Sequence, residues 1–278
     1  MRNRFTGAMV AGTIAAAVAI VSLAETPIFG QGRGGGQAQA RPARIGNAPN
    51  INGIYQAINS ANWNLEDHPA QGLDQFWQLG AIAAIPAGMT VITGDGKIPY
   101  KPEALKVREE NRKGWPKTDP EAKCYMPGIP RASYMPYPFQ IVQGDKDILF
   151  VYEFASSNRI VHMNSDELSP VDSWMGWANG TWKGDTLVIR NTGFNELSWF
   201  DRAGNHHSNQ LVVDEQFTPA QHGLNYVATI TDPETFTRPW TIQMPLYRKV
   251  EPNAQLLEFK CVEFSEELLY GHLKKKTE

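Results

Sequence analysis

The sequence lacks the short motifs that mark several common enzyme classes. Its 278 residues contain no G-x-S-x-G nucleophile elbow, no Walker loop and no strand-borne G-x-G-x-x-G fingerprint. They also contain no H-x-H, H-E-x-x-H or C-x-x-C spacing. Serine-hydrolase, P-loop and dinucleotide chemistry therefore lack their signatures. No metal site is predicted, because its ligands would have to converge from several strands, and no cofactor is indicated.

Basic runs and cysteines are also scarce. The formal charge is -3, and Lys274–Lys276 is the single basic run, so nucleic acid is excluded as an expected partner. Cys124 and Cys261 lie far apart in the sequence. After export they would meet oxidising conditions, and a disulfide closing so long a loop stabilises a protein by roughly 5 kcal/mol in the chain-entropy model. Two buried free thiols are the alternative.

The N-terminus predicts export. Arg2 and Arg4 precede an uncharged apolar stretch from Gly7 to Ala24, which has the organisation of a signal peptide. A retained membrane anchor is the alternative, because the 18 residues of this stretch are at the lower limit for a bilayer span. We expect a signal peptide over residues 1–30, a periplasmic or secreted mature protein, and no membrane span after cleavage.

The rest of the chain predicts a flexible leader and one large β domain. Residues 31–48 are rich in Gly, Gln, Ala and Arg without apolar periodicity, a composition that does not form a core. From residue 49 to 278, short β-branched and aromatic segments alternate with turn residues, as in antiparallel strands. The expected strands are 139–143, 147–154, 159–163, 186–190, 210–217, 224–230, 241–247 and 256–264. Helices are expected at 73–84, 102–112 and 265–273.

Eight or more strands favour a closed sheet. An open sheet exposes two edges, and soluble all-β proteins usually remove these by closure. The predicted fold is therefore mainly β, an antiparallel calycin- or lipocalin-like barrel with a few short peripheral helices, in preference to an open sandwich. A barrel of eight strands leaves an interior just wide enough for one small ligand.

The densest polar cluster is Trp199–Ser208, between two expected strands. A carboxylate beside a histidine can fix the histidine's tautomer and raise its basicity, as general acid–base catalysis requires. Asp201 is therefore a candidate to orient His207 or His206. The alternative is a turn in which Asp201 caps backbone amides and both histidines are exposed to solvent.

A second candidate cluster contains Tyr152, Glu153, Arg159 and His162. Side chains alternate across a strand, so Arg159 and His162 project to opposite faces. If Glu153 and Arg159 face inward, they form a buried ion pair; the alternative is a pair at the barrel rim. Aromatic residues that suit a ligand cleft, or simply a core, are also abundant, and the candidate ligand-binding tryptophans are Trp174, Trp177, Trp199 and Trp240.

Several longer strings carry a resemblance. They are CYMPGIPR from Cys124, YPFQIVQ from Tyr137, GTWKGDTL from Gly180, WFDRAG from Trp199 and FTRPW from Phe236. Together they resemble a group of secreted bacterial β-rich proteins, over about residues 52–273. The resemblance implies an extracytoplasmic compartment and a β-rich fold, and it supplies no catalytic residues.

Three functions compete at this point. The first is binding of a small hydrophobic or aromatic molecule inside a periplasmic or secreted barrel. The second is a cofactor-free hydrolase, lyase or isomerase, with His207 as general base, Asp201 orienting it, and Arg159 or Arg131 stabilising an anion. The third is a structural or envelope-interaction protein. The first two depend on an enclosed interior. Ligand binding is the predicted function and catalysis is its alternative, because the sequence carries no recognised catalytic motif.

Overall fold

A computed structural model describes residues 43–72 and 84–273. The expected signal peptide and most of the leader lie outside the described residues, as does the helix expected at 73–84, apart from Ala84. The last residues of the expected leader pair as a short ladder between β1 (Arg44–Ile45) and β2 (Ala48–Pro49). A second ladder joins β4 (Gln71–Gly72) to β5 (Ala84–Ile85).

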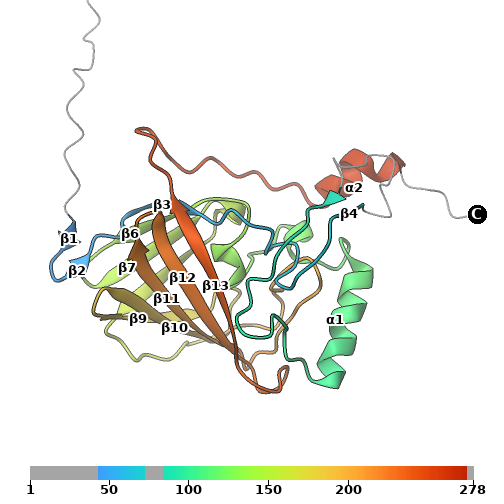
Figure 1. Ribbon diagram of the computed structural model, residues 1–278, viewed down its shortest axis with the longest axis horizontal. Helices are drawn as coiled ribbons and strands as arrows, with labels where there is room; N and C mark the ends of the chain where they lie inside the picture. Colours follow the sequence, from blue (N-terminus) through green and yellow to red (C-terminus); the bar gives the residue numbers. More distant parts are fainter. Residues whose placement is uncertain (1–42, 73–83, 274–278) are drawn as a thin grey trace, which may run out of the picture. The chain divides into compact units, whose positions relative to one another are not determined.

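Nine strands close into a barrel (Figure 1). Their order around the barrel is β10-β11-β12-β13-β3-β6-β7-β8-β9. The strands are β3 (Gly53–Gln56), β6 (Phe139–Gln143), β7 (Asp147–Tyr152), β8 (Asn158–Met163), β9 (Trp177–Lys183), β10 (Thr186–Thr192), β11 (Val212–Ala220), β12 (Gly223–Thr231) and β13 (Trp240–Arg248). The predicted closed, mainly β architecture is confirmed.

The sheet is mixed, which corrects the expectation of a purely antiparallel barrel. Strands β8 and β9 pair in parallel, with Val161 opposite Ala178, and the other neighbouring pairs are antiparallel. The reason is parity, since an odd number of strands that alternate in direction cannot close without one parallel pair. Residues 164–176 make this connection, returning the chain from the end of β8 to the start of β9.

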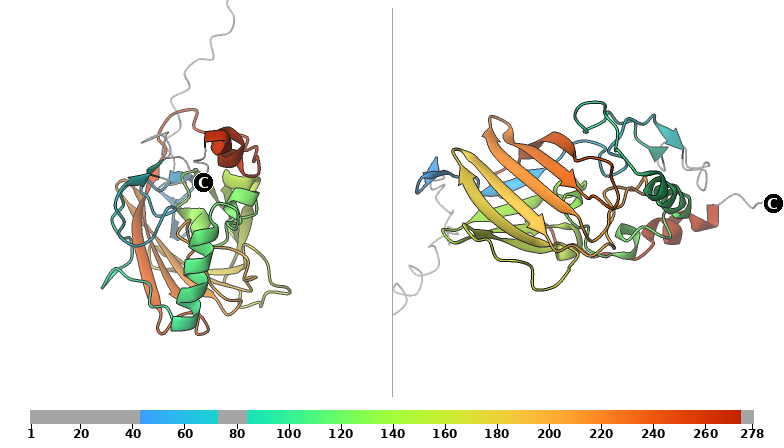
Figure 2. Two further views of the ribbon diagram at one scale, coloured as in Figure 1. Left: turned by 90° about the vertical axis from the view of Figure 1, so that its right-hand side faces the viewer. Right: turned by 90° about the horizontal axis from the view of Figure 1, so that it is seen from below.

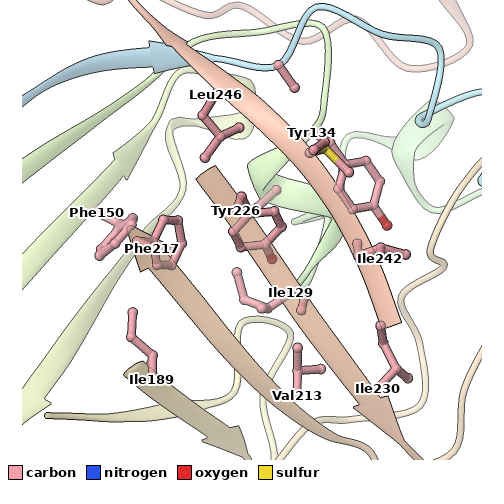
Figure 3. Packing of buried hydrophobic residues seen from close by; sticks show 14 of the residues in the cluster. Ile129, Tyr134, Phe150, Ile189, Val213, Phe217, Tyr226, Ile230, Ile242 and Leu246 are labelled. Atoms are coloured by element: carbon pink, nitrogen blue, oxygen red, sulfur yellow. The ribbon is translucent and has the colours of Figure 1, made fainter. Parts of the chain in front are cut away.

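The barrel interior holds the core. Inward-facing positions alternate with outward ones along each strand, so that β11, for example, buries Val213, Glu215 and Phe217. Figure 3 shows inward side chains of β10 to β13, with Tyr226 near the centre of the view and Phe150 beside Phe217. Burial of this many large apolar side chains is the main source of stability.

Connections differ sharply between the two ends of the barrel. Short turns 144–146, 184–185 and 221–222 join strands at one end. The other end carries the long insert 57–138 and the loops 153–157, 193–211 and 232–239. Helix α1 (Pro102–Gly114), which confirms the helix predicted there, lies beyond this second end (Figures 1 and 2). Binding sites are usually built where such loops gather on a rigid sheet.

The chain after β13 forms a strap along the molecule. The strand expected at 256–264 is wrong, because this segment runs without sheet partners and is held by separate contacts. Phe259 packs on Tyr137 and Phe154, with ring centroids 5.1 and 4.9 Å apart. The expected disulfide joins Cys124 to Cys261. Helix α2 (Ser265–Tyr270) follows, where a helix was predicted, and no helix of the described residues is long and apolar enough to cross a bilayer.

Candidate functional site

The barrel interior contains a buried ion pair between Arg159 and Glu215. Arg159 Nη1 donates to the Glu215 carboxylate at 2.5 Å and to Asn191 Oδ1 at 2.8 Å, and Tyr226 donates to Glu215 at 2.7 Å. Burial alone would lower the pKa of Arg159. The Glu215 carboxylate has the larger opposing effect, so the pKa is raised overall. Neither the buried Glu153–Arg159 pair nor its alternative at the barrel rim is formed, because Glu153 follows the end of β7 and accepts the Leu257 amide.

Aromatic side chains fill the space around this pair. The Arg159 guanidinium lies 4.5 Å from the ring centroid of Phe150, and Phe150 packs on Phe217 at 5.3 Å. Tyr152, a predicted ligand residue, is 2% exposed in the same cluster, and burial raises the pKa of its hydroxyl to about 12. The space around this ion pair is thus occupied by the protein's own side chains.

Asp201 organises backbone, as in the capping alternative. Its carboxylate accepts the amides of Leu65 and Ala203 at 2.9 Å and the side-chain amide of Asn205 at 2.6 Å. Burial raises its pKa to about 6 despite these hydrogen bonds. These contacts tie the start of the long insert to the loop after Phe200, and they replace the expected pairing of Asp201 with His207.

His207 is buried instead of exposed and pairs with a serine. Its Nδ1 lies 2.8 Å from the carbonyl oxygen of Ser208, which can only accept, so Nδ1 carries the proton. Nε2 then accepts from the Ser198 hydroxyl at 2.8 Å. Burial lowers the pKa of His207 to about 4. The neighbouring His206 stacks on Tyr100 with ring centroids 5.6 Å apart, and burial also lowers its pKa.

Arg131 is likewise buried, and it supports a second arginine. Its guanidinium donates to Asp119 at 3.1 Å, to Glu121 at 2.6 Å and to Asn62 at 2.8 Å. Glu121 in turn accepts Arg202 Nε and Nη2 at 2.8 and 2.7 Å. Burial alone would raise the pKa of Glu121. The nearby guanidinium groups of Arg202 and Arg131 have the larger effect and lower the pKa to about 2. This chain of charges fixes the position of Arg202.

Arg202 lies in the wall of a cleft of about 720 Å³. Its guanidinium carbon is 4.4 Å from the ring centroid of Trp63 and 5.8 Å from that of Trp115. The cleft is bounded by two parts of the insert, residues 63–72 with Ile85 and α1 with Trp115, and by the loop that carries Arg202. Its lining is Trp63, Asn64, Glu66, Asp67, His68, Pro69, Gln71, Gly72, Ile85, Arg108, Glu109, Arg112, Lys113, Trp115, Arg202 and Ala203. Its volume is within the usual range for small-molecule sites.

Gly204 explains how α1 comes to border this cleft. It has a φ of +85°, and a Cβ there would lie 2.7 Å from the Arg108 carbonyl oxygen and 2.8 Å from the Arg112 nitrogen. Asn111 Nδ2 donates to its carbonyl at 3.2 Å. Only glycine lets the loop approach the helix so closely. The Trp199–Ser208 cluster singled out in the sequence therefore shapes one side of the cleft.

The remaining predicted site residues are dispersed. His162 stacks on Trp177 on the outer surface, with centroids 4.4 Å apart, and contacts Asp147. Trp174 stacks on Tyr125 at 4.9 Å. Trp199 and Trp240 are buried. The predicted residues therefore do not converge, and within 43–72 and 84–273 no group of three or more His, Cys, Asp or Glu side chains is placed to hold a metal ion.

Sequence reasoning missed the residues that do converge. Trp63, His68, Arg108 and Trp115 all lie in the insert. The available signal was the string W-N-L-E-D-H from Trp63, which places an indole, two carboxylates and an imidazole within six residues.

Comparisons with protein-family models, with curated proteins and with solved structures find no match for this chain.

Proposed function

We propose that this protein binds a small organic molecule outside the cytoplasm, in the cleft between α1 and the end of the barrel. The observation that carries the proposal is the pair of indoles, Trp63 and Trp115, held around Arg202 beside an open volume of about 720 Å³. A rigid aromatic surface with polar groups at its edge is the usual composition of a ligand site. The disulfide supports the compartment, because such bonds persist in oxidising environments.

Rigidity is the second argument for a binding site. Glu121, held by buried Arg131, fixes Arg202, and cation–π contact with Arg202 holds Trp63. A site whose side chains are already immobilised loses little conformational entropy on binding, so more of the contact energy becomes affinity. The calycin-like identity of the barrel and a ligand site inside it stay predictions, and the ligand site proposed here lies at the barrel's end.

A thermal-shift screen of the mature protein tests the proposal. A library of small aromatic compounds, aromatic acids and sugars should contain compounds that raise the melting temperature. Trp63→Ala should abolish the shift, whereas Trp177→Ala, which removes a half-buried indole from the outer barrel wall, should preserve it. Gly72→Phe is a further variant, because Gly72 lines the cleft and a Cβ there meets nothing within 4 Å. The proposal fails if no compound shifts the wild type, or if Gly72→Phe leaves every shift unchanged.

Catalysis is a second candidate, and the Ser198–His207 contact favours it. A neutral imidazole that accepts a serine hydroxyl proton is the arrangement of a nucleophile with its base. Ser198 and His207 are only 2% and 3% exposed, so a substrate would need local opening to reach them. A fluorophosphonate probe should label Ser198, as detected by mass spectrometry, and His207→Gln should prevent labelling. Absence of label on Ser198 in the folded protein would remove this candidate.

A further inference from the structure

The polarity of the cleft distinguishes between ligand classes, and this step rests on the proposed function. We infer that the ligand is an uncharged saccharide, a single sugar or a short oligosaccharide, that stacks on Trp63 and Trp115. The alternatives among small organic ligands are an apolar molecule and an aromatic acid. Three features of the lining favour the saccharide: its hydrogen-bonding groups, its balance of unpaired charges and the geometry of its indoles.

Residues with hydrogen-bonding side chains outnumber apolar ones in the lining. Apart from the two indoles, the apolar side chains are those of Pro69, Ile85 and Ala203. The polar ones are Asn64, Glu66, Asp67, His68, Gln71, Arg108, Glu109, Arg112, Lys113 and Arg202. An apolar ligand would remove many of these groups from water without replacing their hydrogen bonds, which is unfavourable. A ligand with hydroxyl groups replaces them.

The charges in the cleft balance once the ion pairs are assigned. Arg202 is paired with Glu121, and Arg108 Nη2 lies 3.0 Å from Glu66. The rim then carries two cations, Arg112 and Lys113, and two carboxylates, Asp67 and Glu109. None of these four exposed side chains has an ion-pair partner among the described residues.

This balance argues against a charged ligand. An anion attracted to Arg112 and Lys113 would also be repelled by Asp67 and Glu109. A cation attracted to the two carboxylates would likewise be repelled by Arg112 and Lys113. A hydroxyl group donates one hydrogen bond and accepts others. Neighbouring hydroxyls on one sugar ring can therefore satisfy a carboxylate and an ammonium or guanidinium group at the same time.

The indoles supply the second half of saccharide recognition. The ring centroids of Trp63 and Trp115 are 6.0 Å apart, with their planes inclined at 57°. Each indole offers a flat apolar face, and the C–H groups on one face of a sugar ring pack against such a surface while its hydroxyls project from the edge. Both tryptophans are half-buried, so part of each indole is exposed in the cleft.

Calorimetric and thermal-shift titrations with matched probes test the inference. The probes are glucose, galactose, mannose, N-acetylglucosamine and their disaccharides, with 2-naphthoate and 2-naphthamide as charged and neutral aromatic comparisons. At least one saccharide should bind, with an affinity that is insensitive to salt between about 50 and 500 mM, because an uncharged ligand is not screened. Glu109→Gln should weaken that binding about tenfold, the scale of one lost charge-assisted hydrogen bond. Glu110→Gln, the neighbouring α1 residue outside the lining, should leave it unchanged.

The outcomes separate this inference from the proposed function. Binding of a naphthalene probe that Trp63→Ala abolishes, with no binding of any saccharide, would overturn the saccharide assignment and leave ligand binding in the cleft intact. Equal weakening by Glu109→Gln and Glu110→Gln would also overturn the assignment. If no saccharide, naphthalene probe or library compound binds, the proposed function itself falls.

Discussion

The barrel interior and the cleft use the same chemistry for different ends. In the interior, Arg159 pairs with Glu215 and stacks 4.5 Å from a phenylalanine ring; at the barrel end, Arg202 pairs with Glu121 and stacks 4.4 Å from an indole. The interior pair is 2% and 0% exposed, whereas the Arg202 side chain is 18% exposed. The sealed pair is in contact with the core alone, whereas the partly open one is also exposed in the cleft.

The loops explain this difference between the two regions. The interior is enclosed by regular strands whose alternate side chains meet at the axis, so space there is filled. The cleft lies between the insert, including its helix α1, and the Arg202 loop. Hydrogen bonds to Asp201 and the close approach at Gly204 set the positions of these elements. These elements contact one another without the regular packing of strands, which leaves room beside the indoles.

The largest expected effect comes from breaking the interior pair. Glu215→Leu leaves the Arg159 guanidinium buried without its carboxylate, which should cost about 3–5 kcal/mol in the free energy of unfolding. Urea denaturation measures this loss. The control is Asp214→Ala on the outer face of the same strand, which breaks an exposed pair with Arg190 and should cost less than about 1 kcal/mol. Equal losses for the two variants would contradict the distinction between sealed and open ion pairs.

The disulfide links the strap to the segment that carries Glu121. Cys124 follows Glu121 closely, and Phe264 donates its amide to Ala122 on the same turn. The double variant Cys124→Ser/Cys261→Ser should lower the free energy of unfolding by about 2–4 kcal/mol. Denaturation and limited proteolysis both measure this, with early cleavage expected within 249–263. Unchanged stability and an uncleaved strap would show that the packing of Phe259 holds the segment without the bond.

Period-two alternation allowed much of the barrel to be predicted. The expected strand at 139–143 matches β6, and those at 224–230 and 241–247 match β12 and β13 to within one residue at each end. Strand β9 was missed because Ala178, Asn179 and Gly180 have little β-propensity. Gly180 is nevertheless required, since a Cβ there would lie 2.5 Å from a Val161 side-chain carbon across the parallel junction.

The site was harder to predict than the barrel because it depends on long-range partners. Arg131, Arg159, Asp201 and His207 were predicted as site residues, and the structure buries all four. Their partners Glu121, Glu215, Leu65 and Ser198 lie 9 to 136 residues away in the sequence, and strand periodicity does not identify them. The cleft combines residues from 63 to 72 with α1 and Arg202. Such a combination follows from how an insert folds back on a loop, which local patterns do not encode.

His207 provides a pH test of the buried loop. Its pKa falls from 6.5 when unfolded to about 4 when folded, because burial disfavours the charged ring. Between these values the unfolded chain binds more protons, so the contribution to stability is complete above pH 6.5 and is lost as the pH falls toward 4. The loss is about 3 kcal/mol at most. His207→Gln should flatten the dependence of unfolding free energy on pH in this window. Asp201 acts in the opposite direction, because burial raises its pKa to about 6, so the difference between wild type and variant is the quantity to measure.

The smallest expected effect concerns the wall of the cleft. A Cβ on Gly88 would lie 2.0 Å from Ser60 Oγ and 2.3 Å from His68 Cε1, whereas one on Gly72 meets nothing within 4 Å. Gly88→Ala should therefore cost about 1–2 kcal/mol of stability by displacing these side chains, and it should weaken cleft binding, because His68 is part of the lining. Gly72→Ala should change stability by less than about 0.5 kcal/mol. Thermal denaturation and ligand titration of both variants measure the difference. If Gly88→Ala lowers stability but leaves binding unchanged, His68 does not contribute to recognition, and the insert and the site are less tightly coupled than the contacts indicate.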